Sequence, residues 1–151
     1  MARIGDDGPV PHAREVLRPD HVEPWLVLAE HQIKSGETSQ ALRNLQAGLN
    51  TVENQSVLYL EIGKLYRNDR QQTKALEAFR SAVKAAEEYP DTNPWIRMKA
   101  HIMLGRSLRE LGHLSEARSM LQKVLANTPH HPEAAYEYAL ILLDMDEPRG
   151  A

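Results

Sequence analysis

SVLYLEIGKLYRNDRQQTKALEAFRSAVKAAEEY, residues 56–89, carries the clearest structural pattern in the chain. Its first half has one face of core-type side chains at helical spacing, made by Tyr59, Ile62, Gly63 and Tyr66. Its second half follows a polar turn at 68–72 and has a similar face, made by Ala75, Phe79 and Ala82. Large and small side chains alternate on both faces, as two closely packed antiparallel helices require. We therefore predict that residues 56–89 form a helical hairpin.

The composition is that of an ordinary soluble globular protein. The 151 residues are 42% hydrophobic and 26% charged, which suits one domain with a core. A net charge of −3 gives no general reason to expect nucleic-acid binding. No apolar run approaches the ~18 residues that membrane insertion needs. The absence of cysteine excludes disulfides and thiolate metal sites. The compartment stays unknown, with the cytoplasm favoured if the chain is complete.

The hairpin pattern recurs along the chain. The equivalent first core positions, 34, 42 and 34 residues apart, are Trp25, Tyr59, His101 and Ala135. A small residue recurs four positions later, as Ala29, Gly63, Gly105 and Ala139. In the predicted second helices, Ala41, Ala75 and Ala117 are each followed after four residues by Leu45, Phe79 and Leu121. The predicted units are therefore 22–55, 56–97 and 98–131, with a terminal helix at 132–145 and a tail at 146–151.

This pattern resembles the tetratricopeptide repeat (TPR), in which Trp, Leu, Gly, Tyr, Ala, Phe and Pro recur over about 34 residues. The unit at 56–97 matches best, whereas Gln32 and His101 stand where an aromatic or bulky apolar residue is usual, and Glu53 and Glu87 stand where proline is usual. The resemblance implies an all-α fold. Its expected form is a right-handed superhelical array of antiparallel helix hairpins, a TPR-like α-solenoid.

The two ends of the array leave alternatives open. Residues 1–21 form either a loose lead-in, with a short helix at 12–18, or the remnant of a preceding repeat. The predicted terminal helix is apolar on more than one side because it contains Tyr138, Leu142 and Leu143, so we expect another surface to cover it.

The eight extra residues between the second and third units have two interpretations. Eight residues are roughly two helical turns, so one turn added to each of the two flanking helices would keep the packing register. The alternative is a long loop. The helix-favouring run KAAEE at 84–88 supports longer helices.

The resemblance implies that the first helix of each unit lines a concave groove. An apolar stripe is expected there from Leu26, Leu60, Ile102 and Tyr136. A basic centre, flanked by acidic residues from the outer units, is expected from Lys64, Arg67, Lys99, Arg106 and Arg109, with Trp95 on the same helical stripe. The alternatives are that the apolar residues bury against neighbouring helices, that the basic residues form a solvated face, and that Trp95 packs on Tyr89.

These candidates predict a scaffold that binds a protein or peptide, extended or helical and rich in carboxylates. Relatives that hold a terminal Glu-Glu-Val-Asp carboxylate use Lys, Asn and Arg at positions that are occupied here by Leu26, Glu30, Glu61, Lys99 and Met103. Only Lys99 agrees with that pattern, so the sequence argues against such a clamp.

The sequence gives no sign of catalysis or of a cofactor. His130 and His131 are adjacent, so they lack the i, i+4 spacing of a helical metal pair. There is no Gly-rich phosphate loop and no nucleophile motif. We therefore expect no enzyme and no metal. The alternative function is structural, a self-association or spacer module of a larger repeat protein.

Overall fold

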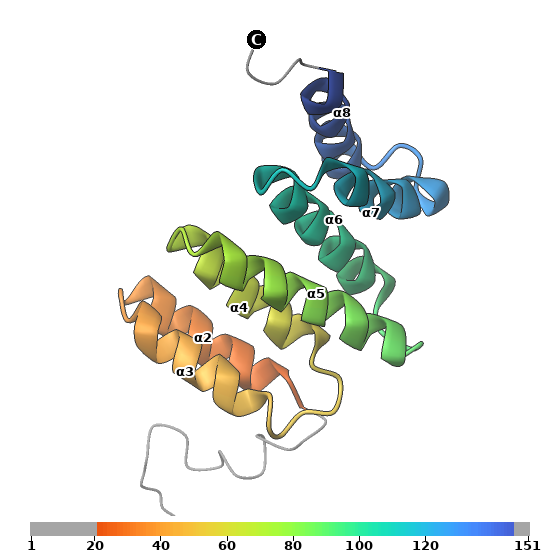
Figure 1. The fold of residues 1–151 in the computed structure, drawn as a ribbon. Coiled ribbons are helices and arrows are strands. Elements are labelled where there is room, and N and C mark those ends of the chain that lie inside the picture. The colour runs from red at the N-terminus through yellow and green to blue at the C-terminus, as the bar shows by residue number, and fades with distance from the viewer. Residues whose placement is uncertain (1–20, 147–151) are drawn as a thin grey trace, which may run out of the picture.

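The computed structural model describes residues 21–146, and the helix predicted at 12–18 lies outside this range. The described part is built from helices and turns, with no strand (Figure 1). In chain order the helices are α2 (Glu23–Lys34), α3 (Thr38–Gly48), α4 (Ser56–Asn68), α5 (Gln72–Glu88), α6 (Pro94–Glu110), α7 (Leu114–Asn127) and α8 (Pro132–Asp146). The prediction of an all-α array of helical hairpins is confirmed.

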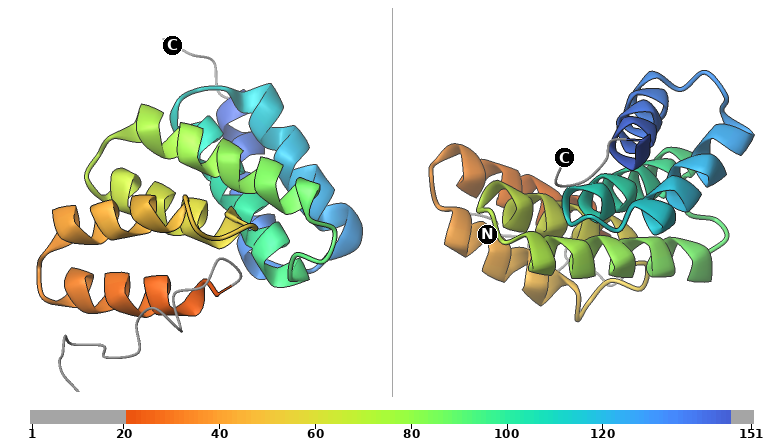
Figure 2. Two further views of the ribbon diagram at one scale, coloured as in Figure 1. Left: turned by 90° about the horizontal axis from the view of Figure 1, so that it is seen from below. Right: turned by 45° about the horizontal axis from the view of Figure 1, so that its top comes forward.

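The hairpins stack side by side in chain order. The pairs are α2 with α3, α4 with α5 and α6 with α7, and α8 packs on α7 at the end of the array (Figure 2). Helices α4 and α6, the first helices of the second and third hairpins, also contact each other, and α6 contacts α8 in the same way. We call the surface made by α4, α6 and α8 the first-helix surface. The predicted groove also included α2, which carries Leu26.

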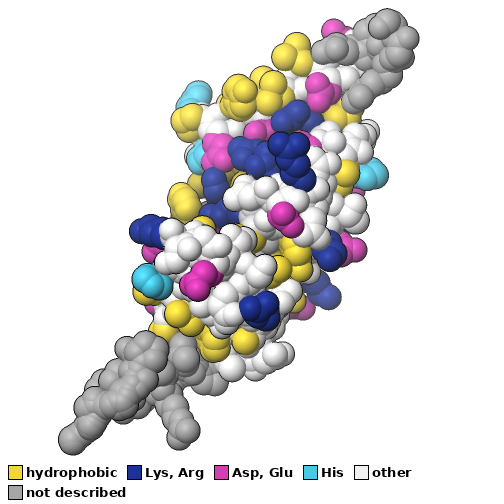
Figure 3. All heavy atoms as spheres, turned by 90° about the vertical axis from the view of Figure 1, so that its left-hand side faces the viewer, with side chains coloured by type: hydrophobic (Ala, Val, Ile, Leu, Met, Phe, Trp, Pro, Cys, Tyr) yellow, Lys and Arg dark blue, Asp and Glu magenta, His cyan; other side chains and the backbone are white. Residues whose placement is uncertain are grey.

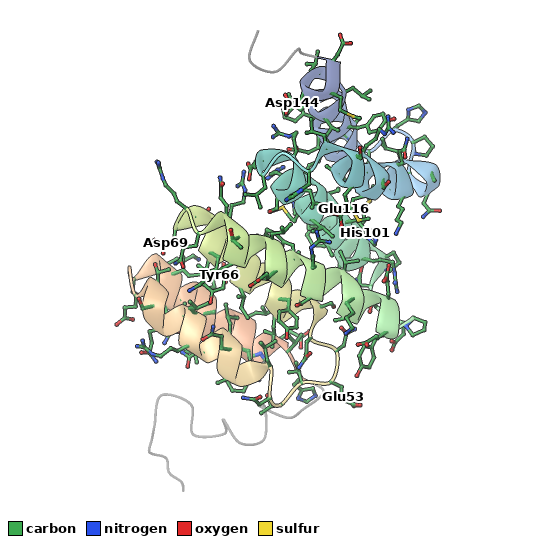
Figure 4. The ribbon with its side chains drawn as sticks, viewed as in Figure 1. Glu53, Tyr66, Asp69, His101, Glu116 and Asp144 are labelled. Atoms are coloured by element: carbon green, nitrogen blue, oxygen red, sulfur yellow. The ribbon has the colours of Figure 1, made fainter. Side chains whose placement is uncertain are left out.

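The hydrophobic core falls into two clusters. The smaller one lies among α2, α3 and α4 and centres on Leu45 and Leu58, and the larger one runs from α4 to α8 and includes Phe79 and Leu121. Tyr66 packs against both clusters, from the C-terminal part of α4 (Figure 4). Each cluster joins at least two successive hairpins, so no hairpin buries its apolar surface alone.

Small residues let the paired helices approach closely. A Cβ added at Gly63 would lie 2.5 Å from the ring of Phe79, and one added at Gly105 would overlap Leu121. Both contacts join the first helix of a hairpin to the second. The alternation of bulky and small side chains predicted for residues 56–89 is therefore present in two successive hairpins.

The eight extra residues lengthen helices. Both α5 and α6 have 17 residues, against 11 in α3 and 13 in α4. The turn between α5 and α6 is short and hydrogen-bonded. The Thr92 hydroxyl donates to the Tyr89 carbonyl at 2.6 Å, and the Asn93 side chain caps α6 by accepting from the Trp95 amide at 2.8 Å. The long-loop alternative is therefore wrong.

Two helix ends depend on local turns. Helix α3 ends at Gly48, where the Thr51 hydroxyl donates to the Gly48 carbonyl at 3.0 Å and helps to close a turn. The cap position of α7 is His113, and no side chain bonds there. Both ends are set by turn geometry that hydrophobic spacing does not report.

Candidate functional site

A pocket of about 240 Å³ lies between α4 and α6 on the first-helix surface. Its walls are formed by Lys64, Arg67, Asn68, Lys99, Met103 and Arg106. We call it the α4–α6 pocket. Four of these residues belong to the predicted basic centre, so the structure brings most of that centre together around one depression.

The cations of the predicted basic centre all have carboxylate partners. The Arg67 guanidinium donates twice to Glu110, at 2.6 and 3.2 Å. The Lys99 ammonium lies 3.0 Å from both oxygens of Glu133. The ammonium of Lys64 lies 3.0 Å from a Glu61 oxygen on the same helix. These pairs occupy the basic side chains before any partner arrives.

The network continues from α6 onto α8. Arg106 donates through Nε to Glu137 at 2.8 Å and through Nη2 to Glu133 at 3.0 Å. Arg109 lies 3.4 Å from Glu137 and 3.6 Å from Asp144. Asp144 projects from α8 at the end of the array (Figure 4). We call the five cations and their five carboxylates the charge network. It balances in formal charge, so the expectation of a net positive centre is corrected: acidic residues are part of the centre rather than only flanking it.

The network is partly buried, so its charged groups depend on their partners. Glu137 is buried, and both of its oxygens accept from arginines, as a buried carboxylate requires. Burial alone raises the pKa of Glu133, but the hydrogen bond and charge of Lys99 and the charge of Arg106 outweigh it, so the pKa of that carboxyl is lowered. The hydrogen bond that Arg67 donates to Glu110 raises the pKa of Arg67. Arg67 and Glu133 are therefore both charged at neutral pH.

The predicted apolar stripe is broken. Leu60 and Ile102 lie in the larger core cluster and are almost wholly buried, whereas Leu26 is half-buried and Tyr136 is exposed. The reason is positional. Leu60 and Ile102 lie on α4 and α6, which contact each other directly, while Leu26 and Tyr136 lie on the first and last helices. The expectation that Leu60 and Ile102 line the groove is corrected, and their alternative reading, burial between helices, holds.

Trp95 lies at a different place from the basic residues. It is 58% exposed and lines a second pocket of about 660 Å³ between α6 and α7. The side chains around it there include Met98, His101, Lys123 and Val124. We call this the α6–α7 pocket. The α6–α7 pocket and the α4–α6 pocket share no lining residue. The residues predicted to form a single stripe from Trp95 to Arg109 therefore lie on two separate surfaces.

His101, which departs from the repeat pattern, lies on α6 (Figure 4). Its Nδ1 lies 2.9 Å from the Arg97 carbonyl, and its Nε2 lies 3.9 Å from a Glu87 oxygen. The imidazole is buried and has a backbone partner, so it acts as a core residue with one polar bond.

The sequence predicts acidic residues beside the basic centre but not that they pair with it. The signal was present, because Glu133 and Glu137 are four residues apart and therefore share one face of α8. Arg106 and Arg109, three residues apart on α6, form the matching face. What spacing could not tell was that these two faces meet.

The described residues hold no group of three or more His, Asp or Glu side chains placed to bind a metal ion. Nor is any helix within 21–146 both long and apolar enough to cross a membrane.

Comparisons with known proteins agree on one family. Models described as tetratricopeptide repeat match residues 57–89 and 102–145. Comparison with curated proteins gives no match. Among solved structures, the first TPR of Spaghetti (RPAP3) bound to the HSP90 peptide SRMEEVD is 22% identical, with a TM-score of 0.68, over 83% of this chain and 98% of that one.

Two further structures are similar. The second TPR domain of human RPAP3, in complex with the HSP70 peptide SGPTIEEVD, is 20% identical with a TM-score of 0.64, over 78% of this chain and 91% of that one. The C-terminal TPR-containing domain of a Plasmodium falciparum FK506-binding protein is 17% identical with a TM-score of 0.66, over 97% of this chain and 98% of that one. At these identities the likeness establishes the fold.

Proposed function

The chain belongs to the tetratricopeptide repeat family, and we propose that it is a protein-interaction module that binds an acidic peptide segment on its first-helix surface. The observation that carries this proposal is the α4–α6 pocket, in which lysine and arginine side chains from two hairpins converge on one depression. A carboxylate entering the pocket would meet several donors at once, the arrangement in which charge-assisted hydrogen bonds are strong.

The pairing inside the charge network decides which side chains are ready for a partner. Lys64 is 43% exposed at its side chain, and its ion pair with Glu61 lies on the surface of one helix. Such a pair is worth about 0–1 kcal/mol, so a partner carboxylate can replace it at small cost. Asn68, also exposed, can donate from its amide. We therefore assign first contact to Lys64 and Asn68, with Lys99 deeper in the pocket.

The arginines have a second role. Arg67 and Arg106 hold α4, α6 and α8 together through bonds to carboxylates, so a partner that takes Arg106 must leave the buried Glu137 with fewer donors. We propose that these arginines mainly set the shape and charge of the pocket. Reversing Arg106 and Arg109 to glutamate would confuse loss of binding with loss of folding.

The peptides bound by the two RPAP3 domains end in Glu-Glu-Val-Asp. At the positions where the resemblance implies Lys, Asn and Arg for that grip, this chain has Leu26, Glu30, Glu61 and Met103, with Lys99 alone in agreement. We therefore expect SRMEEVD to bind this chain weakly. The proposed partner carries its acidic residues within a segment.

The experiment is a peptide-display selection on the immobilised chain, followed by titration of the most enriched peptide by fluorescence anisotropy. We expect acidic residues to be enriched. Replacing Lys64 and Asn68 by alanine should weaken that peptide by about tenfold or more, since each bond to a charged group contributes about 1.5–3 kcal/mol.

The matched control is Lys84→Ala, which removes an exposed lysine from α5 and leaves the pocket intact. It should bind like the wild type. A selection without acidic enrichment, or a Lys64/Asn68 double variant that binds as tightly as the wild type, would contradict the proposal. A fluorescently labelled SRMEEVD peptide serves as the comparison probe.

The alternative proposal is a structural self-association or spacer module. The observation that favours it is the exposed apolar surface of α8, where Tyr136, Leu142 and Leu143 face away from the core.

A further inference from the structure

The last helix, α8, has two contrasting faces. Ala134, Glu137 and Ile141 are buried against the array. The opposite side exposes side chains that fall on one helical stripe, at Ala135, Ala139, Leu142, Leu143 and Asp146. We call this stripe the outer face of α8. Hydrophobic side chains gather at the upper end of the molecule, where α8 lies (Figure 3).

The chain itself shows what such a face receives. In the two preceding hairpins, the residue equivalent to Ala139 is Gly63 or Gly105, and a bulky side chain of an antiparallel helix lies directly against it. Those bulky residues are Phe79 and Leu121, both wholly buried. Ala139 keeps the small residue at this position but is exposed, because the described residues supply no helix to cover it. The outer face is thus shaped for an antiparallel helix.

We propose that the occupant is α8 of a second copy of this chain, packed antiparallel with the two-fold axis beside Ala139. In that register Ala139 faces its own counterpart, and Leu143 of each copy faces Ala135 of the other. At the axis two small Ala139 side chains meet, unlike the contacts at Gly63 and Gly105, and this lets the two helices approach closely. At both ends a large side chain lies opposite a small one, as in the intramolecular hairpins. An isologous contact of this kind closes as a dimer.

Charge is compatible with the pairing although α8 is acidic. Glu133, Glu137 and Asp144 are held by cations of α6, on the side away from the outer face. Asp146 is the acidic residue on the outer face, and in this register it lies opposite Pro132, at the start of the second copy's α8. A carboxylate near a helix N-terminus is stabilising. The two Asp146 residues stay about 21 Å apart along the helices, too far to repel strongly.

The proposed dimer leaves the peptide site unchanged. The outer face and the α4–α6 pocket share no residue, so the two proposals can fail separately.

The first test follows the mass of the 151-residue chain by sedimentation velocity over a series of concentrations. We expect the apparent mass to rise from that of one chain to that of two. Leu143→Glu should keep the chain monomeric, whereas Val27→Glu should dimerise like the wild type. The control is well matched because Leu143 is 59% exposed and Val27, on α2, is 64% exposed. Both positions are exposed, so both variants should keep the wild-type circular dichroism.

The second test reads the register by disulfide crosslinking, which is clean because the chain has no cysteine. Ala139→Cys alone should crosslink to itself under mild oxidation. A mixture of Ala135→Cys and Leu143→Cys chains should crosslink to each other more than either does to itself, because the antiparallel register brings positions 135 and 143 together.

A chain that stays monomeric at all concentrations would overturn the proposal and leave the outer face to a different partner. Dimerisation that survives Leu143→Glu would also overturn it, by placing the contact elsewhere. If positions 135 and 143 each crosslinked to themselves and not to each other, the antiparallel register would be refuted.

Discussion

Replacing Gly63 by alanine tests the packing rule of the array at a close contact between two paired helices. The new Cβ would lie 2.5, 2.7 and 2.8 Å from three ring carbons of Phe79, where ordinary carbon contacts are about 3.5–4.0 Å. The ring therefore has to retreat by about 1 Å. Phe79 is completely buried in the larger core cluster, so that movement displaces its neighbours as well.

The expected cost is the balance of two terms. Overpacking a well-packed core costs about 1–3 kcal/mol. Replacing glycine by alanine within a helix returns about 0.5–1 kcal/mol. We expect Gly63→Ala to lower the free energy of unfolding by about 0.5–2 kcal/mol, which is a fall of about 2–6 °C in Tm for a chain of this size.

The assay is urea unfolding followed by circular dichroism. Ser119→Ala, at an exposed position of α7, is the control for helix propensity without a clash and should be neutral or slightly stabilising. In a double-mutant cycle, Phe79→Leu should cost less in the Gly63→Ala background than in the wild type, because the smaller side chain relieves the clash. A Gly63→Ala chain as stable as the wild type, or more stable, would refute the reasoning.

Three further predictions concern single side chains. Glu133 binds its proton more weakly in the folded chain than in the unfolded one, so its stabilising effect is present above its ordinary pKa of 4.5 and is lost as pH falls below it. Glu133→Gln should therefore flatten the acid limb of a curve of unfolding free energy against pH. An unchanged limb would contradict this. Removing the buried carboxylate by Glu137→Ala should destabilise the chain by about 3 kcal/mol in urea unfolding, whereas the exposed Glu30→Ala should change it by less than about 0.5 kcal/mol; similar values for both would show that the buried pairs contribute little. Trp95→Ala should lower the free energy of unfolding by under about 1 kcal/mol, because Trp95 is exposed. Trp25→Ala, which removes the ring packed on Gly48, should lower it by about 3 kcal/mol. The reverse order in the same assay would be inconsistent with the packing described.

The hairpins were predictable because their signal is local and repeated. Residues such as Gly63 and Phe79 recur at fixed offsets, and the spacing of turns limits where each helix can begin. The extra turns of α5 and α6 followed from the same logic, since adding about 3.6 residues to each helix preserves the register.

The surface was less predictable because it depends on contacts between hairpins. Spacing placed Leu60 and Leu26 at equivalent positions. Leu60 is buried because its helix, α4, contacts α6, whereas Leu26 on α2 stays half-buried. Arg106 and Glu137 each belonged to a recognisable charged face, yet their pairing needed the crossing of α6 and α8. Trp95 shares a helical stripe with Lys99, but α7 draws it into another pocket.

The division of the core into two clusters makes the array unequal in its dynamics. The cluster shared by α2 and α3 is the smaller one, and it is joined to the rest chiefly through α4. In a chain of stacked units, stability is a sum of each unit and its nearest contacts, so the hairpin with fewer contacts opens first. We expect backbone amides in α2 and α3 to exchange their hydrogens faster than those in α5 and α6. Such local opening would expose the inner side of α4 while the charge network between α6 and α8 stays closed, so one end of the array can loosen without releasing the other.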